Sequence, residues 1–260
     1  MSNRFPRPSV MGIVNVTPDS FSDGGVHLDP DSAVAAAHRL VEEGAAIVDV
    51  GGESTRPGHE PVPLDDELRR VLPVIERLDG VPVSIDTSKA EVARRALELG
   101  AELVNDVTAL RGDAGMAGLV ATSRAWVCLM HWEREPAYAD VVSDVAAFLE
   151  ERLRFAVDAG IDEEHIVLDP GIGFGKTVQQ NFELVRRLPE LVSLGRPVLV
   201  GFSRKSSLGR ILGDEKAKTG PLSASLAAAV VAYERGATIL RAHDVRAHVE
   251  ALTVAAAVSG

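Results

Sequence analysis

Polar side chains follow apolar stretches at eight points along this 260-residue chain. One subset, Asp86, Asn105 and Asp169, offers carboxylate and amide oxygens. A second subset offers cations in an otherwise acidic chain. A pocket that combined the two subsets could bind a small heterocycle with N–H donors beside an anionic group. The polar positions are Asn15, Glu53 to Arg56, Asp86, Asn105, His131, Asp169, Lys205, and Arg241 with His243, and the cations are Arg56, Lys205, Arg241 and His243.

The segment 166–177 (IVLDPGIGFGKT) shows this pattern in full, because an apolar run ends at Asp169 and a glycine-rich loop follows. The end of the segment resembles a phosphate-binding P-loop, which also requires a glycine five positions before Gly175. Pro170 stands there and has no N–H to donate to a phosphate. The loop is therefore not predicted to cradle phosphate, and Lys176 is interpreted as a loop residue or as one that supports the residues of the site.

Each polar residue also has an ordinary structural interpretation. Asp106 and Asp244 could cap helices, and Asp49 could be a buried hydrogen-bonding group. Asn15 with Asp19 could bind a metal weakly or form an Asx turn, and His131 could be a site wall or purely structural. The set as a whole favours a site, because caps do not require polarity at nearly every strand end. The other five histidines have no such neighbours and are expected at the surface: His27, His38, His59, His165 and His248.

Eight short apolar runs are predicted to be strands, and most are followed by a segment with helical periodicity. Strands that alternate with helices form parallel βαβ units, and eight units in about 250 residues are typical of a (β/α)8 TIM barrel. We predict this α/β fold as a single domain over residues 1–260, with a doubly wound open sheet as the alternative. The predicted strands are residues 10–16, 45–50, 81–85, 101–104, 125–130, 166–168, 197–201 and 237–240.

The predicted helices are read from apolar spacing and end signals. Ser88 and Glu91 have the spacing of a capping box, which predicts a helix from there to Leu99. One helix is predicted to run through both Leu184 and Leu188, and a long amphipathic helix to carry Phe148 on its apolar side. The remaining helices are expected near residues 31–43, 64–78, 116–122, 222–234 and 245–258.

The composition argues against a nucleic-acid-binding, secreted or membrane protein. A net charge of −11 argues against nucleic acid as the main partner, since phosphate binding needs a basic surface. The lone Cys128 allows no internal disulfide and suits a reducing compartment. No segment reads as a signal peptide or a membrane span. These features predict a cytoplasmic protein with no membrane partner.

Eight ordered blocks cover almost the whole chain and together resemble the dihydropteroate synthase family. Any one of the shorter blocks alone would be a weak signal. The first two are residues 11–25 (MGIVNVTPDSFSDGG) and 49–58 (DVGGESTRPG). The others are residues 84–89 (SIDTSK), 105–107 (NDV), 129–131 (LMH), 169–175 (DPGIGFG), 203–205 (SRK) and 241–245 (RAHDV).

The resemblance implies a pterin-binding TIM barrel, usually a homodimer, that acts as a transferase in folate biosynthesis. It would condense 6-hydroxymethyl-7,8-dihydropterin diphosphate with 4-aminobenzoate, releasing diphosphate and 7,8-dihydropteroate. Mg2+ is the implied cofactor, held mainly by diphosphate oxygens and few protein groups. Members of the family are targets of sulfonamides, which mimic aminobenzoate.

The same resemblance assigns roles to individual residues. Asp86, Asn105, Asp169, Lys205 and Met130 would bind the pterin, whose paired N–H donors suit a carboxylate. Diphosphate would be bound by Asn15, Arg56, Arg241 and His243, with Asn15 on the metal. Aminobenzoate would be bound by Phe21, Thr55, Arg56, Pro57, Phe174 and Ser203. Asp86, Lys205, Arg56 and Asp19 would be catalytic.

No activated Ser, Cys or His is required for this chemistry, because diphosphate is a good leaving group. Asp86 would stabilise a cation on the pterin, and the neutral amine would attack, so catalysis is expected to be electrostatic and positional. Two alternative functions remain, and the first of them would share the pterin-holding acids Asp86, Asn105 and Asp169. A folate-binding methyltransferase domain would not need the STRPG loop, and a catalytically silent pterin- or diphosphate-binding paralogue would bind without turnover.

Overall fold

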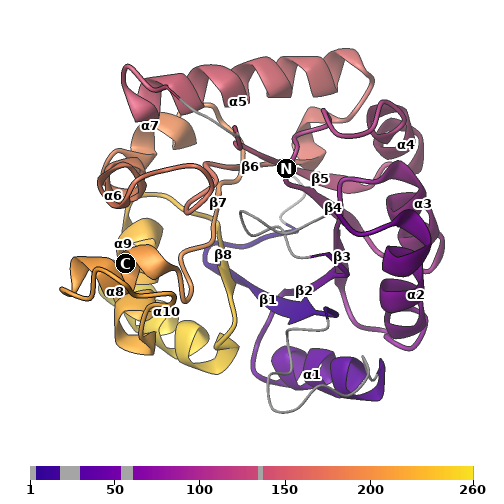
Figure 1. Cartoon of the computed structure of the whole chain (residues 1–260), viewed down its shortest axis with the longest axis horizontal. Helices are drawn as coiled ribbons and strands as arrows, with labels where there is room; N and C mark the ends of the chain where they lie inside the picture. The colour runs from indigo at the N-terminus through magenta and orange to yellow at the C-terminus, as the bar shows by residue number, and fades with distance from the viewer. Residues whose placement is uncertain (1–3, 18–29, 54–60, 134–136, 260) are drawn as a thin grey trace.

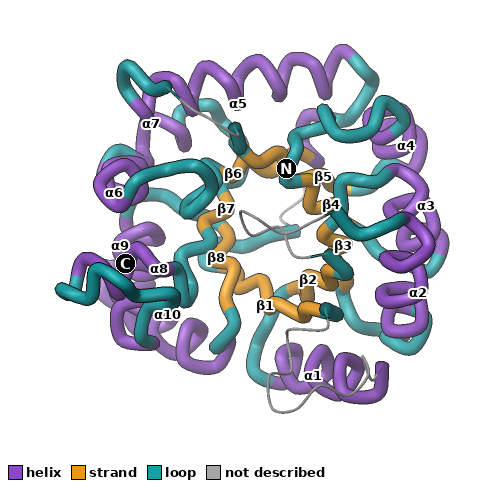
Figure 2. The backbone as a smooth tube through the Cα atoms, viewed as in Figure 1, coloured by secondary structure: helices purple, strands orange, loops and turns teal. Residues whose placement is uncertain are grey.

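The computed structural model describes residues 4–17, 30–53, 61–133 and 137–259. Eight parallel strands lie at the centre and helices surround them (Figures 1 and 2). The sheet order is β6-β5-β4-β3-β2-β1-β8-β7, so neighbours in sequence are neighbours in space. The strands are β1 Ser9–Asn15, β2 Ile47–Gly51, β3 Val83–Asp86, β4 Leu103–Asp106, β5 Trp126–Met130, β6 Ile166–Asp169, β7 Leu199–Val200 and β8 Ile239–Ala242.

The sheet curls until its two edge strands meet. A parallel bridge joins Leu168 of β6 to Val198, next to β7, and the Leu168 N–H donates to the Pro197 carbonyl at 2.9 Å. Closure removes the open edges that a doubly wound sheet would leave. The predicted (β/α)8 barrel is confirmed and the open-sheet alternative is wrong.

Each strand is followed by at least one helix outside the barrel (Figure 2). The helices are α1 Pro30–Glu42, α2 Leu64–Ile75, α3 Ala90–Glu98, α4 Met116–Ser123, α5 Val141–Asp158, α6 Val178–Arg186, α7 Leu188–Val192, α8 Ser206–Ile211, α9 Leu222–Glu234 and α10 Val245–Ser259, with the 3-10 turn η1 Glu163–His165 before β6. The expected helix through Leu184 and Leu188 is two helices that break at Arg187.

The capping box expected at Ser88 is not formed. Helix α3 begins at Ala90 after Lys89, whose side chain makes no cap hydrogen bond. Instead the Asp113 carboxylate, from the loop after β4, accepts the Ala90 N–H at 2.9 Å. A residue distant in sequence therefore satisfies a helix N-terminus that local spacing had assigned to Ser88.

Side chains on alternate strand positions face the barrel interior, and their character changes along the axis. The interior near the strand starts is an apolar cluster of Phe5, Met11, Ile47, Leu103, Trp126, Cys128, Val167, Leu199 and Ile239. Two or four positions further along the same strands stand Asn15, Asp49, Asn105, Asp169 and Arg241. The barrel is thus packed at its base and polar at its C-terminal mouth, which is where such folds bind ligands.

Candidate active site

A fully buried carboxylate, Asp49, lies at the centre of the polar layer. It accepts hydrogen bonds from Ser84 Oγ at 2.6 Å, Asn105 Nδ2 at 2.9 Å and Arg241 Nε at 2.7 Å. The donors come from β3, β4 and β8, so one side chain fixes groups on three strands. This confirms that Asp49 is a buried hydrogen-bonding group and adds that it orients two predicted site residues.

The Arg241 guanidinium joins Asp49 to Asp86. Its Nη2 donates to Asp86 Oδ2 at 3.0 Å, while Asp86 Oδ1 has no hydrogen-bond partner among the described residues. Burial raises the pKa of Asp86, the nearby Asp49 carboxylate raises it further, and Arg241 opposes both. Two buried carboxylates thus share one cation, and Asp86 Oδ1 is a buried acceptor that no described residue satisfies.

Asp169 lies on β6, three strands along the sheet from Asp86 on β3, and stands opposite Met130 in the register of β5 and β6. Its Oδ1 accepts the Gly171 N–H at 2.7 Å. Burial raises the pKa of Asp169 to about 6, against the lowering effects of that N–H and of Lys205. The carboxylate is therefore held in place but poorly solvated, a state that donors on a ligand would improve.

Lys205 reaches this region from the loop after β7. Its Nζ lies 4.3 Å from the centroid of the Phe174 ring, a cation–π contact. Gly173 has a left-handed φ of +82°, which favours glycine, and a Cβ there would lie 2.9 Å from Lys205 Cδ. Phe174 and Lys205 therefore form one edge of the mouth together.

Ser203 and His243 form a second pair at the mouth. Ser203 Oγ lies 3.1 Å from His243 Nδ1 and accepts the His243 backbone N–H at 3.2 Å. Burial lowers the pKa of His243 to about 3, and Arg204 and Arg241 lower it in addition. His243 is therefore neutral near pH 7, and the expectation that it contributes a cation is wrong. The Arg204–Asp244 ion pair at 2.5 Å flanks the pair.

A cavity of about 350 Å3 opens between the loop after β6 and helix α8. Its walls include Gly173, Lys176 and Thr177 on one side and Ser206 and Arg210 on the other. Sequence reasoning did not single out Ser206 or Arg210. Helix α8 is only six residues long and has no apolar periodicity that would predict it.

Other predicted site residues have mixed outcomes. Asn15 ends β1 beside Gly51, at the mouth. Glu53 is tied to Lys89, which also pairs with the buried Glu67, so it is part of an internal ion-pair cluster. His131 is buried against Phe148 and Tyr138. His248 is also buried, contrary to its expected surface position, and its Nδ1 lies 2.8 Å from the Asp244 carbonyl oxygen. Five predicted residues lie outside the described part of the chain: Asp19, Phe21, Thr55, Arg56 and Pro57.

The donor set is compatible with the expected Mg2+, provided that the ligand supplies most of the coordination. Within the described ranges, no three His, Cys, Asp or Glu side chains gather as a metal site. Mg2+ commonly keeps its waters and binds through substrate phosphates and one or two protein oxygens. The Asn15 amide oxygen at the mouth fits that limited role.

Comparisons with known proteins agree with this geometry. Residues 11–243 match the model of the pterin binding enzyme family. The chain is 50% identical to dihydropteroate synthase of Mycobacterium leprae, over 95% of this chain and 92% of the relative. It belongs to the dihydropteroate synthase family. The Escherichia coli K12 dihydropteroate synthase is 45% identical, over 95% of this chain and 90% of that protein.

Solved dihydropteroate synthases share the barrel. A structure from Xanthomonas albilineans with 4-aminobenzoic acid has a TM-score of 0.91 and 52% identity, covering 98% of this chain and 94% of that chain. A second structure from that organism, in complex with 7,8-dihydropteroate, has a TM-score of 0.88 and 50% identity, with the same coverage. The predicted family, fold and transferase activity are confirmed. Where the structure describes the chain, no helix has the length and apolar character needed to cross a bilayer.

Proposed function

We propose that this dihydropteroate synthase family member condenses 6-hydroxymethyl-7,8-dihydropterin diphosphate with 4-aminobenzoate, giving 7,8-dihydropteroate and diphosphate. The observation that carries the proposal is the polar layer at the barrel mouth, in which Asp86, Asn105, Asp169 and Arg241 come from four different strands. Relatives of the same fold have been solved with 4-aminobenzoic acid and with 7,8-dihydropteroate.

The pterin is proposed to lie against Asp169, Asn105, Asp86, Lys205 and Met130. Asp169 is the anchor, because its poorly solvated carboxylate can accept two parallel N–H donors from the 2-amino-pyrimidine edge. The Lys205 ammonium can donate to the carbonyl oxygen or to a ring nitrogen. Met130 precedes His131 at the end of β5 and gives the flat ring an apolar neighbour.

The diphosphate is proposed to bind Asn15, Arg241 and His243, with Arg56 as a further cation. Arg241 is already oriented by Asp49, so little side-chain entropy remains to be lost on binding. His243, being neutral, acts as a hydrogen-bond donor. Mg2+, when bound through Asn15 and the diphosphate oxygens, offsets negative charge on the leaving group.

Aminobenzoate is proposed to stack on Phe174 and to direct its carboxylate towards Ser203, with Phe21, Thr55, Arg56 and Pro57 as further contacts. Ser203 Oγ already contacts His243, so its hydroxyl lies between the proposed diphosphate site and the proposed aminobenzoate site. Ser206 lines the neighbouring cavity and offers a second hydroxyl to the carboxylate.

In the proposed reaction, the bond between the exocyclic methylene carbon and the diphosphate oxygen breaks, and diphosphate leaves with the bonding electrons. Asp86 stabilises the positive charge on the pterin, and Arg241 and Arg56 stabilise the departing anion. The aromatic amine then forms the C–N bond and loses one proton to solvent or to diphosphate. Lys205 and Asp19 are proposed to assist by holding the pterin and the leaving group.

The chain is further proposed to act as a single domain over residues 1–260, in the cytoplasm, without nucleic acid or membrane partners. One closed sheet that uses strands from both ends of the chain supports the single domain. A homodimer is proposed through α9 and α10, which pack on each other and expose Val231, Val254 and Val258. Sedimentation at micromolar concentration should show a dimer, and a monomer at that concentration would exclude this interface.

The function is tested by incubating the purified chain with the pterin diphosphate, 4-aminobenzoate and Mg2+, and measuring diphosphate and 7,8-dihydropteroate together. Equal amounts of the two products are expected, and a sulfonamide should lower both. Pterin binding without release of diphosphate would instead identify a silent paralogue.

A further inference from the structure

Lys176, the residue that ends the glycine-rich loop, turns its ammonium back into the loop. Its Nζ lies 3.0 Å from the Gly171 carbonyl oxygen and 3.1 Å from that of Phe174. It also lies 3.3 Å from the His131 carbonyl oxygen and 3.0 Å from His131 Nδ1. The ammonium therefore ties the loop both to itself and to the end of β5.

These four partners are acceptors without formal charge. An ammonium has only hydrogens to donate, so in its presence His131 Nδ1 must be the lone-pair nitrogen. Burial lowers the pKa of His131 to about 3, and Lys176 lowers it further, which keeps the imidazole neutral. Its ring is fixed by an edge contact with Phe148, at 4.7 Å between centroids. His131 thus offers Lys176 an acceptor whose position is set by packing.

The backbone of the loop has an unusual conformation and lies very close to the end of β5. Gly171, Gly173 and Gly175 all have left-handed φ angles, of +68°, +82° and +64°. A Cβ at Gly171 would lie 2.0 Å from the His131 carbonyl oxygen. The loop is therefore pressed against β5. Lys176 donates to the carbonyls of His131 and Phe174, while the Gly171 carbonyl also accepts the Phe174 N–H at 3.1 Å.

Both ends of this loop carry groups of the proposed site. Asp169 accepts the Gly171 N–H, so its carboxylate orientation depends on where Gly171 lies. The Phe174 carbonyl accepts a hydrogen bond from Lys176, and the Phe174 ring makes a cation–π contact with Lys205. A shift in the loop would move the pterin anchor and the aminobenzoate wall together.

We propose that Lys176 is a positioning residue: its ammonium holds the carbonyls of His131, Gly171 and Phe174 together and so sets Asp169 and Phe174 for the two substrates. The proposal rests on the proposed function for the identity of those substrates. Burial also lowers the pKa of Lys176 to about 7, with Asp169 and Glu133 opposing and Lys205 assisting. The lysine is half-buried and lines the cavity between the loop after β6 and helix α8.

The test begins with Lys176→Met, which keeps the chain length and removes the donors. The affinity for 6-hydroxymethyl-7,8-dihydropterin, measured by calorimetry, should fall by roughly tenfold to a hundredfold, with a higher KM for both substrates. Lys176→Gln keeps N–H donors and should lose less, and it replaces the Met variant if that protein does not fold. Lys218→Met, at an exposed lysine, is the matched control and should bind like the wild type.

Chemical rescue separates positioning from general destabilisation. Lys176→Cys, treated with 2-bromoethylamine, regains an amine of lysine length, and the cavity beside residue 176 admits the reagent. The native Cys128 is fully buried, so the treated wild type is the control for side reactions. The proposal predicts recovery of most of the pterin affinity. Wild-type affinity in the Met variant, or no recovery in a folded and fully modified Cys variant, would overturn it. Binding is read without turnover, so a failure of the synthase assay would not be confused with a failure here.

Discussion

At the scale of single residues, two carboxylates and one guanidinium define the electrostatics of the mouth. Asp49 and Asp86 both bind Arg241, so the trio carries a net negative charge when both acids are ionised. Low solvent access strengthens the interaction between this charge and a cation on a bound ligand. A site built in this way favours a positively charged transition state and disfavours an anion placed directly against Asp86.

Asp169 should show a trade-off between stability and binding. Its folded-state pKa of about 6 lies above the ordinary value of 3.8, so the protonated form is favoured by folding. Wild-type stability is therefore lost as pH rises from about 4 through 6, by up to about 3 kcal/mol. Asp169→Asn carries no such charge and should be the more stable protein above pH 6, while binding the pterin much more weakly. Urea unfolding at pH 4 and pH 8 measures the difference.

The pH profile of binding gives a second check on Asp169. Pterin affinity of the wild type should decrease below about pH 6, because the carboxylate must be ionised to accept two N–H donors. Asp158→Asn, at an exposed position at the end of α5, is the matched control. A pH-independent affinity, or an Asn variant that loses stability at pH 8, would contradict the assigned role.

The sequence predicted the polar side chains at the strand ends. It did not predict that Asp49 would connect residues on different strands. Asp86, Asn105 and Asp169 follow apolar runs, so their place at the mouth follows from the fold alone. Asp49 lies inside a strand, and its partners Ser84 and Asn105 are on other strands. Only the register, in which Asp49 stands beside Ser84, brings them together.

At the scale of helices and strands, a helix was predicted well where its sequence pattern ran over many residues. The prediction failed where a helix begins or ends because of a residue distant in sequence. Helix α9 has the predicted bounds, 222–234, because an alanine-rich run offers no competing structure. The capping box at Ser88 failed because Asp113 supplies the acceptor. The break between α6 and α7 lies at Arg187, whose partners belong to more than one element.

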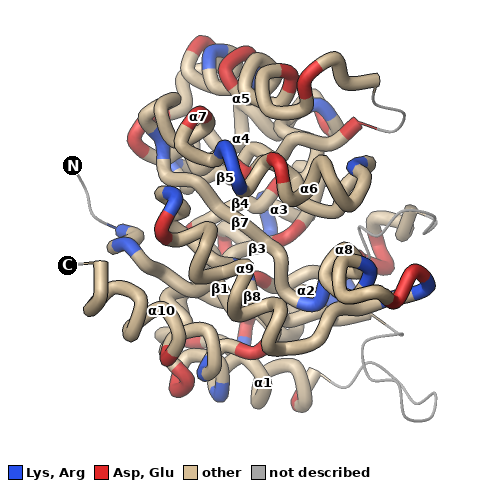
Figure 3. The backbone as a smooth tube through the Cα atoms, turned by 90° about the vertical axis from the view of Figure 1, so that its left-hand side faces the viewer, with Lys and Arg blue, Asp and Glu red and all other residues tan. Residues whose placement is uncertain are grey.

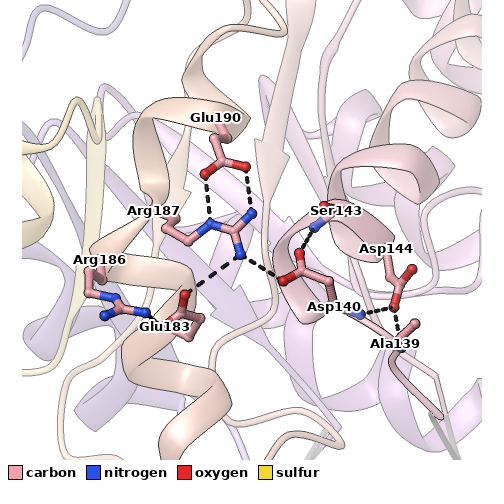
Figure 4. Close-up of polar contacts among 8 residues, drawn as sticks. All are labelled: Ala139, Asp140, Ser143, Asp144, Glu183, Arg186, Arg187 and Glu190. Carbon is pink, nitrogen blue, oxygen red and sulfur yellow. Dashed lines mark hydrogen bonds and ion pairs between the residues drawn. The ribbon is translucent and has the colours of Figure 1, made fainter.

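Arg187 joins three helix ends (Figure 4). Its guanidinium pairs with Glu190 of α7 at 2.7 Å, with Asp140 before α5 at 2.7 Å, and with Glu183 of α6 at 3.6 Å. Asp140 also caps α5 by accepting the Ser143 N–H. The network fixes the position of α5, which covers one side of the barrel (Figure 1), relative to α6 and α7.

Because the charges of this network are half-exposed and screened by solvent, Arg187→Gln should lower the Tm only slightly, by no more than about 2 °C. The difference from the wild type should shrink in 1 M salt, where exposed pairs are screened. Arg186→Gln removes a pair within a single helix and is the control. A large loss that salt does not reduce would show that Arg187 has a packing role instead.

At the scale of the whole molecule, the chain combines an acidic surface with a site for two anionic substrates. The acidic and basic positions lie mostly on the outer helices and their loops (Figure 3). With a net charge of −11, long-range attraction does not bring the substrates in. Hydrogen bonds from Arg241 and the charge of Lys205 must therefore supply the affinity, and salt should affect binding more through these contacts than through net charge.

The barrel itself was predictable because eight apolar runs, each with a polar end, leave few alternative folds for 260 residues. The pairing of Ser203 with His243 was not, since it depends on how the loops after β7 and β8 meet. Nor was the neutral state of His243, because burial and the neighbouring arginines decide it.

Asp86 is proposed to stabilise a cation formed as diphosphate leaves. Its most direct test is Asp86→Asn, assayed by diphosphate release and, separately, by calorimetric binding of the pterin diphosphate. Asp66→Asn on the exposed side of α2 serves as the control. Turnover should fall by roughly a hundredfold to a thousandfold, much more than binding weakens. Near-normal turnover in Asp86→Asn would show that Asp86 does not stabilise such a cation.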